Sequence, residues 1–133
     1  MARQVESDLT KLDMHAIAAA LQQYLISSQK YLERHPEVKE DLKQRIEQNM
    51  ELAKSAQQKF SAFEQDMQLR EIRMAYFCVH NFRHRLSAIL AAQNTPDNVR
   101  VSAQKLQQPS ESAFMKLHQI LVSVGDNPAN YEA

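Results

Sequence analysis

The sequence predicts an all-α protein, and three observations on its 133 residues lead to this prediction. Ala, Gln, Leu, Glu and Lys, which are good helix formers, dominate the composition. Glycine occurs once and proline four times, so there are few residues to make tight turns between strands. Apolar residues recur at intervals of three and four over long stretches, which is the period of a helix face. We therefore expect an elongated antiparallel helical bundle with a single domain over residues 1–133 and no strands.

The first helix is expected over about residues 8–34, with Ser7 or Asp8 at its start. Its alanines predict a close approach of a neighbouring helix. The segment ERHPEV should end this helix, because Pro36 disfavours a helical residue before it and suits the first position of a new helix. The apolar arc of the first helix consists of Leu9, Leu12, Ala16, Ile17, Ala20, Leu21, Tyr24, Tyr31 and Leu32.

The second helix is expected over about residues 36–93 as one very long central helix, because no strong breaker interrupts it. At 1.5 Å per residue it would reach roughly 85 Å, which is longer than its neighbours can cover. Either it bends or part of it meets another chain, so a homodimer or a protein partner is predicted. Its coiled-coil-like seam has alternating spacings of four and three. The seam consists of Leu42, Ile46, Asn49, Ala53, Ala56, Phe60, Phe63, Met67, Arg70, Met74, Phe77, Asn81, His84 and Ala88.

A second apolar stripe begins at Leu69, which indicates that this half of the helix is sandwiched between others. The stripe continues through Ile72, Tyr76, Val79, Leu86 and Leu90.

Two shorter helices, about 97–107 and 110–124, should complete the bundle. Thr95 is a candidate N-cap for the first of them. Pro109 and Ser110 are typical of the start of a new helix and so predict the second one. Gly125, the chain's only glycine, stands where a left-handed C-cap is expected, and residues 126–133 are predicted to form a flexible tail.

The composition also argues against several classes of function. Because 16 basic and 16 acidic residues cancel, no overall charge favours nucleic acid. Cys78 is the single cysteine, which excludes an internal disulfide and fits a reducing compartment. The longest uncharged run, residues 14–29, is too polar to span a membrane, and the N-terminus lacks the layout of a signal peptide. With no catalytic motif and no glycine-rich phosphate loop, we expect a cytoplasmic, non-enzymatic protein without a metal, a cofactor or a small-molecule substrate.

One stretch, residues 75–90, concentrates the candidate binding residues. At about 100° per residue, Arg73, His80 and His84 fall on one narrow polar strip between the two apolar stripes. The arginines nearby make the stretch locally positive, with Glu71 alone opposing them, so it could receive an acidic helix or a phosphate. The predicted partner-binding residues are Arg70, Arg73, Phe77, His80, Arg83, His84 and Arg85.

The segment HNFRHRLSAIL, residues 80–90, resembles the H-box of two-component phosphotransfer proteins. Its closest pattern is the variety that reads His-Asp-Phe-Arg-His/Asn-x-Leu. The resemblance implies that His80 is the phosphoacceptor, and that residues 60–93 and 98–124 form a helical hairpin that dimerises into a four-helix bundle. Asn81 stands where that family has an acidic residue, which helps to orient the imidazole.

Two other interpretations of the histidines stay open. His80 and His84 are four residues apart, so they could share a metal ion if His118, His15 or a carboxylate supplied a third ligand. Alternatively, both are ordinary interface histidines that neighbours or water satisfy. The leading prediction is a helical protein-interaction module that acts through the seam and the basic stretch. Such a protein would be an adaptor, small chaperone or regulator in the cytoplasm of a bacterium. The histidine-phosphotransfer module is the alternative.

Overall fold

A computed structural model of the chain describes residues 4–6 and 8–132. It confirms the all-α fold, because helices packed against one another account for most of the chain. Two short paired strands accompany them, although strands were not expected from the composition. The elements in chain order are β1 (Gln4–Glu6), α1 (Lys11–Arg34), α2 (Glu40–Ser61), β2 (Asp66–Gln68), α3 (Leu69–Ala91), α4 (Asp97–Ser123) and the 3-10 helix η1 (Pro128–Tyr131).

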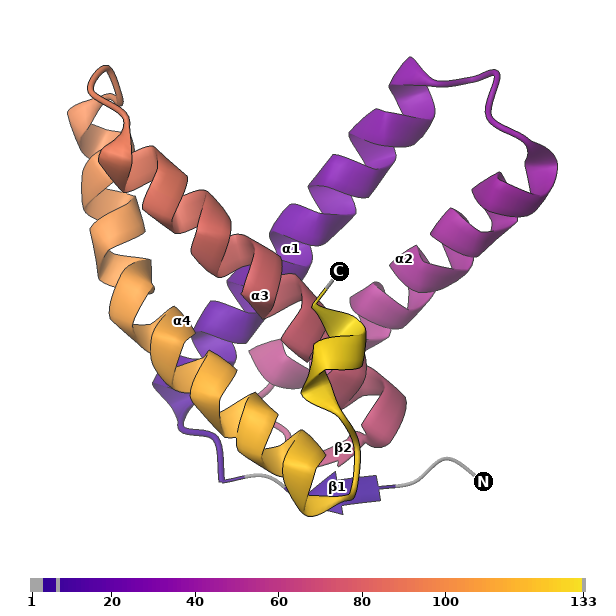
Figure 1. Ribbon diagram of the computed structural model, residues 1–133, viewed down its shortest axis with the longest axis vertical. Coiled ribbons are helices and arrows are strands. Elements are labelled where there is room, and N and C mark those ends of the chain that lie inside the picture. Colours follow the sequence, from indigo (N-terminus) through magenta and orange to yellow (C-terminus); the bar gives the residue numbers. More distant parts are fainter. Residues whose placement is uncertain (1–3, 7, 133) are drawn as a thin grey trace.

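The helices form two antiparallel hairpins, α1–α2 and α3–α4, that spread apart like the arms of a V (Figure 1). The loops at the tips of the two hairpins are far apart, whereas the helices converge at the other end, where β1 and β2 lie. The first half of α1 contacts both α3 and α4, and α2 also packs on α3. The hairpins are therefore in contact at one end and separate at their tips.

The core lies where the hairpins converge, and it includes several alanines. Ala16, Ala20, Ala53 and Ala75 are buried there, which fits the close helix approach that the alanines of the first helix predict. The second apolar stripe of the sequence is also found in the core, because α3 packs between α1, α2 and α4. Its fully or nearly buried members are Ile72, Tyr76, Val79 and Leu86.

The start of α1 differs slightly from the prediction. Thr10 is the N-cap: its hydroxyl accepts a hydrogen bond from the Asp13 N–H, and the Asp13 carboxylate accepts one from the Thr10 N–H. Asp8 therefore precedes the helix, and Ser7 lies outside the described residues. Pro36 does not start the next helix either. It follows His35, whose carbonyl accepts a hydrogen bond from Val38 across a turn, and proline suits the second position of such a turn.

The predicted continuous helix over residues 36–93 is wrong. The chain leaves the helix after Ser61, adopts a left-handed conformation at Phe63 (φ 57°), and pairs β2 with β1 before α3 begins. Buried side chains on both sides of the break, Phe60 and Met67, explain why the chain turns here without a proline or glycine. The chain therefore has no helix of roughly 85 Å between residues 36 and 93 that would need a partner to cover it.

The buried carboxylate of Glu71 stabilises this break. It accepts hydrogen bonds from the Gln68 N–H at 2.9 Å, which caps α3, and from the Ser55 hydroxyl at 3.2 Å. It also forms an ion pair with Lys59 of α2 at 2.8 Å. One side chain thus ties the end of α2 to the start of α3.

The prediction of two C-terminal helices is also wrong, because α4 runs unbroken through Pro109. Proline removes one backbone hydrogen bond and bends a helix rather than ending it when packing on both sides is strong enough. Ala103 and Ala113 are buried on either side, and α4 changes direction along its length (Figure 1). Thr95 does not cap α4, since its hydroxyl donates to the Ile89 carbonyl at 2.8 Å.

Gly125 ends α4 as predicted, in the left-handed region with φ 79°. Its N–H donates to the carbonyl of Val122 and the Asp126 N–H to that of Leu121, which is a Schellman cap. The predicted flexible tail instead contains η1, which packs on α3 and buries Pro128. The Tyr76 hydroxyl donates to the Glu132 carboxylate at 2.8 Å, so a hydrogen bond between residues far apart in the sequence holds this segment against α3.

Candidate interaction groove between the helical hairpins

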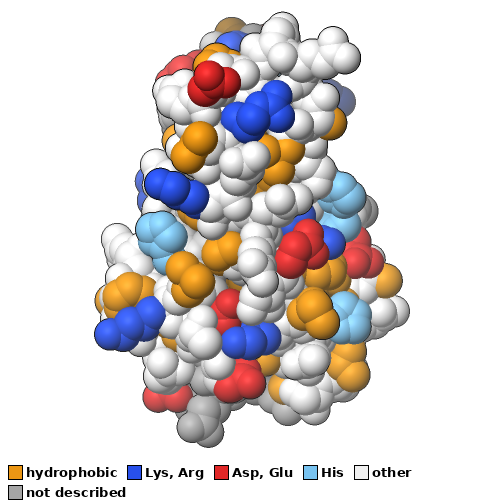
Figure 2. Space-filling view, turned by 90° about the vertical axis from the view of Figure 1, so that its left-hand side faces the viewer, with side chains coloured by type: hydrophobic (Ala, Val, Ile, Leu, Met, Phe, Trp, Pro, Cys, Tyr) orange, Lys and Arg blue, Asp and Glu red, His pale blue; other side chains and the backbone are white. Residues whose placement is uncertain are grey.

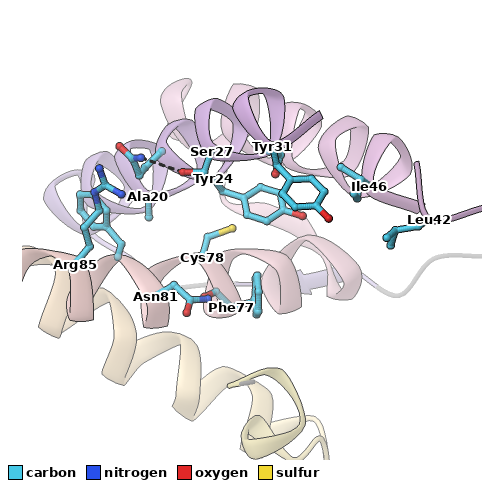
Figure 3. A pocket seen from close by; sticks show the side chains of 13 residues that line it. Ala20, Tyr24, Ser27, Tyr31, Leu42, Ile46, Phe77, Cys78, Asn81 and Arg85 are labelled. Atoms are coloured by element: carbon cyan, nitrogen blue, oxygen red, sulfur yellow. Dashed lines mark hydrogen bonds between the residues drawn. The ribbon is translucent and has the colours of Figure 1, made fainter. Parts of the chain in front are cut away.

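A groove of about 560 Å³ runs between the two hairpins (Figure 3). Its walls come from the second half of α1, the first turns of α2 and the middle of α3, so its shape depends on how far the hairpins spread. The lining residues are Ala20, Gln23, Tyr24, Ser27, Ser28, Tyr31, Leu42, Ile46, Phe77, Cys78, Asn81, Phe82 and Arg85.

The groove is mainly apolar and aromatic. Tyr24 and Phe77 meet edge to face with ring centroids 6.0 Å apart, an arrangement that aromatic pairs favour. Toward the tip of the α1–α2 hairpin, Tyr31 is 42% exposed and Leu42 is 39% exposed. Large apolar side chains that remain this exposed beside a hollow are typical of a surface that a partner covers.

Cys78 lies at the floor of the groove and is buried. Burial raises the pKa of its thiol well above the usual value, so the thiolate needed for nucleophilic chemistry is disfavoured. Cys78 therefore contributes a small apolar surface to the groove.

A second hollow of about 400 Å³ lies on the other side of the Tyr24–Phe77 pair, since both rings line both hollows. It is bounded by α2, the start of α3 and η1. Arg70 and Arg73 are its charged lining residues, and the others are Asn49, Leu52, Met74, Asn130 and Tyr131.

The predicted partner-binding residues do not form one surface. Phe77 and Arg85 line the groove, whereas His80 and Arg83 lie on the other side of α3 and contact α4. Arg70 is exposed beside the second hollow, where its Nε donates to the Gln68 side chain at 2.6 Å.

Acidic residues from distant parts of the chain neutralise two of the predicted arginines. Arg73 pairs with Asp126 at 2.7 Å, and Arg83 pairs with Glu111 at 2.9 Å while its guanidinium lies 3.8 Å from the Phe114 ring centroid. On the face that Figure 2 shows, basic and acidic side chains are interspersed with apolar ones and do not gather into a basic patch. The positive field expected around residues 75–90 is therefore much reduced.

Arg85 differs from these arginines. It is exposed, it lines the groove, and it has no ion pair or hydrogen bond within residues 4–6 and 8–132. It is also the one charged residue among those that line the groove in the described part of the chain.

His80 is half-buried, with its ring edge to face with His84 at a centroid distance of 4.7 Å and 6.0 Å from the Phe114 ring. Its Nδ1 is buried and makes no hydrogen bond to the described residues. Burial lowers the pKa of His80, and the neighbouring His84 lowers it further, so the neutral imidazole is favoured. Among the described residues, no third potential ligand lies close enough to hold a metal ion together with His80 and His84.

Comparisons with protein families, with characterised proteins and with solved structures find no match to this chain. Within the part of the chain that the structure describes, no helix is long and apolar enough to cross a membrane. The candidate function therefore rests on the geometry of the groove.

Eleven of the thirteen groove residues were not among the predicted binding residues. Four of these eleven have large apolar or aromatic side chains on α1 and α2: Tyr24, Tyr31, Leu42 and Ile46. The sequence did carry a signal for them, because the tyrosines belong to the apolar arc of the first helix and the other two to the predicted seam. Their exposure could not be inferred without the angle between the hairpins.

Proposed function

We propose that this chain is a non-enzymatic helical protein-interaction module, such as an adaptor, small chaperone or regulator, and that the groove between the hairpins is its binding surface. The observation that carries the proposal is an apolar, aromatic groove with helices for walls and with partly exposed large side chains at one end.

The composition of the groove supports this function. The buried centres of protein interfaces are enriched in Tyr, Phe and Arg and poor in other charged residues. The groove has this composition, with Tyr24, Phe77 and Arg85 on its walls. A groove between helices is also a common receptor for the apolar face of a partner helix.

A library of amphipathic helical peptides, displayed on phage and selected against the wild-type protein, tests the proposal. Ile46→Asp places a charge in the groove, so selected peptides should bind this variant at least tenfold more weakly. Met115→Asp is the matched control, because Met115 is exposed on α4 and does not line the groove. Failure to select any peptide, or equal binding to both variants, would argue against the groove as a binding surface.

A second copy of the chain is another partner that this test must recognise. Light scattering coupled to size exclusion, over a dilution series, measures whether the wild type self-associates. A dimer that Ile46→Asp dissociates and Met115→Asp retains would mean that the groove functions as a homodimer interface.

Histidine phosphotransfer remains the second candidate, and the α3–α4 hairpin favours it because His80 lies on such a hairpin. Incubation with phosphoramidate, followed by ³¹P NMR, tests whether one histidine is phosphorylated selectively. Selective labelling that His80→Gln abolishes and His15→Gln retains would support it, since His15 is exposed on α1. Equal labelling of both histidines would contradict it.

A further inference from the structure

Arg85 makes one end of the groove positively charged, whereas the other end is apolar. Figure 3 places Arg85 at one end, beside Ala20, while Leu42 and Ile46 lie at the other end. Two polar side chains between these ends are already satisfied within the chain. The Gln23 amide donates to the Ser27 hydroxyl at 3.1 Å, and the Asn81 amide donates to the Phe77 carbonyl at 3.0 Å. Neither of these side chains pairs with Arg85, which is the one charged lining group in the described part of the chain.

The contrast with the outer face of the α1–α2 hairpin supports this view. A hollow there is lined by Lys43, Glu47, Glu51 and Lys54, and charges of both signs lie close together within it. Those charges can satisfy one another, and Lys54 does contact Glu51 at 3.5 Å. The groove instead has one cation in an apolar setting, which favours a ligand with a single negative charge next to an apolar surface.

The openness of the groove distinguishes a helix from an acyl chain. Because Tyr31 and Leu42 are 42% and 39% exposed, one side of any occupant would face water. An acyl chain has no polar side to leave in water, so it binds best in an enclosed cavity. An amphipathic helix, in contrast, buries one face and keeps its polar face solvated.

We propose that the partner of this groove is an amphipathic helix whose apolar face carries one acidic side chain at the end that meets Arg85. This inference rests on the proposed function and names the chemistry of the partner. From Phe77 to Arg85 the wall of α3 rises about 12 Å, or about two helical turns. Over this length the helix presents apolar side chains at i and at i+3 or i+4, with Asp or Glu one turn beyond, at i+7 or i+8.

The test repeats the peptide selection with the position one turn beyond the apolar face randomised among Glu, Gln and Lys. Wild-type protein should enrich Glu at this position, and Arg85→Glu should enrich Lys instead. Anisotropy titrations of a selected Glu peptide should show weakening of about three- to fivefold with Arg85→Gln, as expected for a partly exposed ion pair. Lys105→Glu, an equal charge change on the exposed face of α4, should leave both the selection and the affinity unchanged.

The outcomes separate this inference from the proposed function. Peptides that need an intact Ile46 but show no preference among Glu, Gln and Lys would overturn the acidic partner and leave the interaction module standing. If no peptide is selected, both proposals fail. Dodecanoate, tested by calorimetry, is the probe for a small anionic amphiphile: binding that Arg85→Gln abolishes, without any bound peptide, would assign the groove to that class and overturn the helix.

Discussion

At the scale of single residues, the buried ion pair between Asp13 and Lys116 links the two hairpins. The distance between Asp13 Oδ2 and Lys116 Nζ is 2.7 Å, and the Asp13 side chain is 3% exposed. The same carboxylate caps α1, so one group joins α4 to the start of α1. Asp13→Asn should lower the free energy of unfolding by about 1–3 kcal/mol, because the ammonium of Lys116 would lose its charged partner. Urea denaturation measures the change, and Asp8→Asn, at an exposed position, is the control.

The same residue makes a prediction about pH. Burial by itself would raise the pKa of Asp13, but hydrogen bonds from Lys116 and Thr10 outweigh burial and hold the pKa below its usual value. A carboxylate whose pKa is lower in the folded state stabilises the fold above the unfolded pKa of about 4, and this stability is lost as the pH falls through the folded pKa. The wild type should therefore lose more stability than Asp13→Asn between about pH 4 and pH 2. Parallel acid denaturation curves for the two proteins would contradict the assignment.

At the scale of secondary structure, the sequence and the structure disagree most where long-range packing overrides local propensity. Residues 62–65 contain no glycine or proline, so nothing local predicts the end of α2. Pro109 is the opposite case: its sequence context predicts the end of a helix, but packing keeps α4 continuous through it. Gly125 is correctly predicted because the left-handed cap that glycine favours is a local property.

The left-handed backbone at Phe63 makes this break testable. A non-glycine residue in this region costs about 1–2 kcal/mol, and β-branched residues tolerate it worst. Phe63→Val should therefore lower the free energy of unfolding by about 1 kcal/mol more than Phe63→Gly does. Both variants lose the aromatic ring and its contact with Lys11, so the difference between them isolates the backbone. Thermal denaturation measures both, and equal melting temperatures would contradict a left-handed residue at this position.

The segment after Gly125 gives a second prediction about elements. Ending the chain at Asn127 removes the buried Pro128, the Tyr131 ring that lies 5.6 Å from the Arg73 guanidinium, and the acceptor of the Tyr76 hydroxyl. We expect a loss of about 1–3 kcal/mol in the free energy of unfolding, mainly because the Tyr76 hydroxyl loses its partner. A truncated protein as stable as the wild type in urea would restore the flexible tail that the sequence alone predicts.

At the scale of the whole molecule, the candidate site could be predicted only in part. At about 100° per residue, Phe77 is about 60° from His80 and about 80° from Arg85 around the helix. Periodicity alone therefore does not separate the two groove residues from His80. The acids that neutralise Arg73 and Arg83 are 53 and 28 residues away, so no local pattern reveals them. The groove depends on the angle between two hairpins, which packing at their convergence determines.

Small residues at this convergence allow the hairpins to approach closely, and enlarging one should change the groove. Ala75 of α3 is fully buried in the same core cluster as Ala20 of α1. Ala75→Leu should therefore cost about 1–3 kcal/mol through overpacking and push the hairpins apart. Ala88→Leu is the control, since Ala88 is exposed on the same helix. We expect a lower urea midpoint, a larger radius of gyration by small-angle X-ray scattering and weaker binding of the selected peptides for Ala75→Leu alone. If Ala75→Leu lowers stability but leaves peptide binding unchanged, the groove does not depend on the spacing of the hairpins, and one hairpin by itself must form the binding surface.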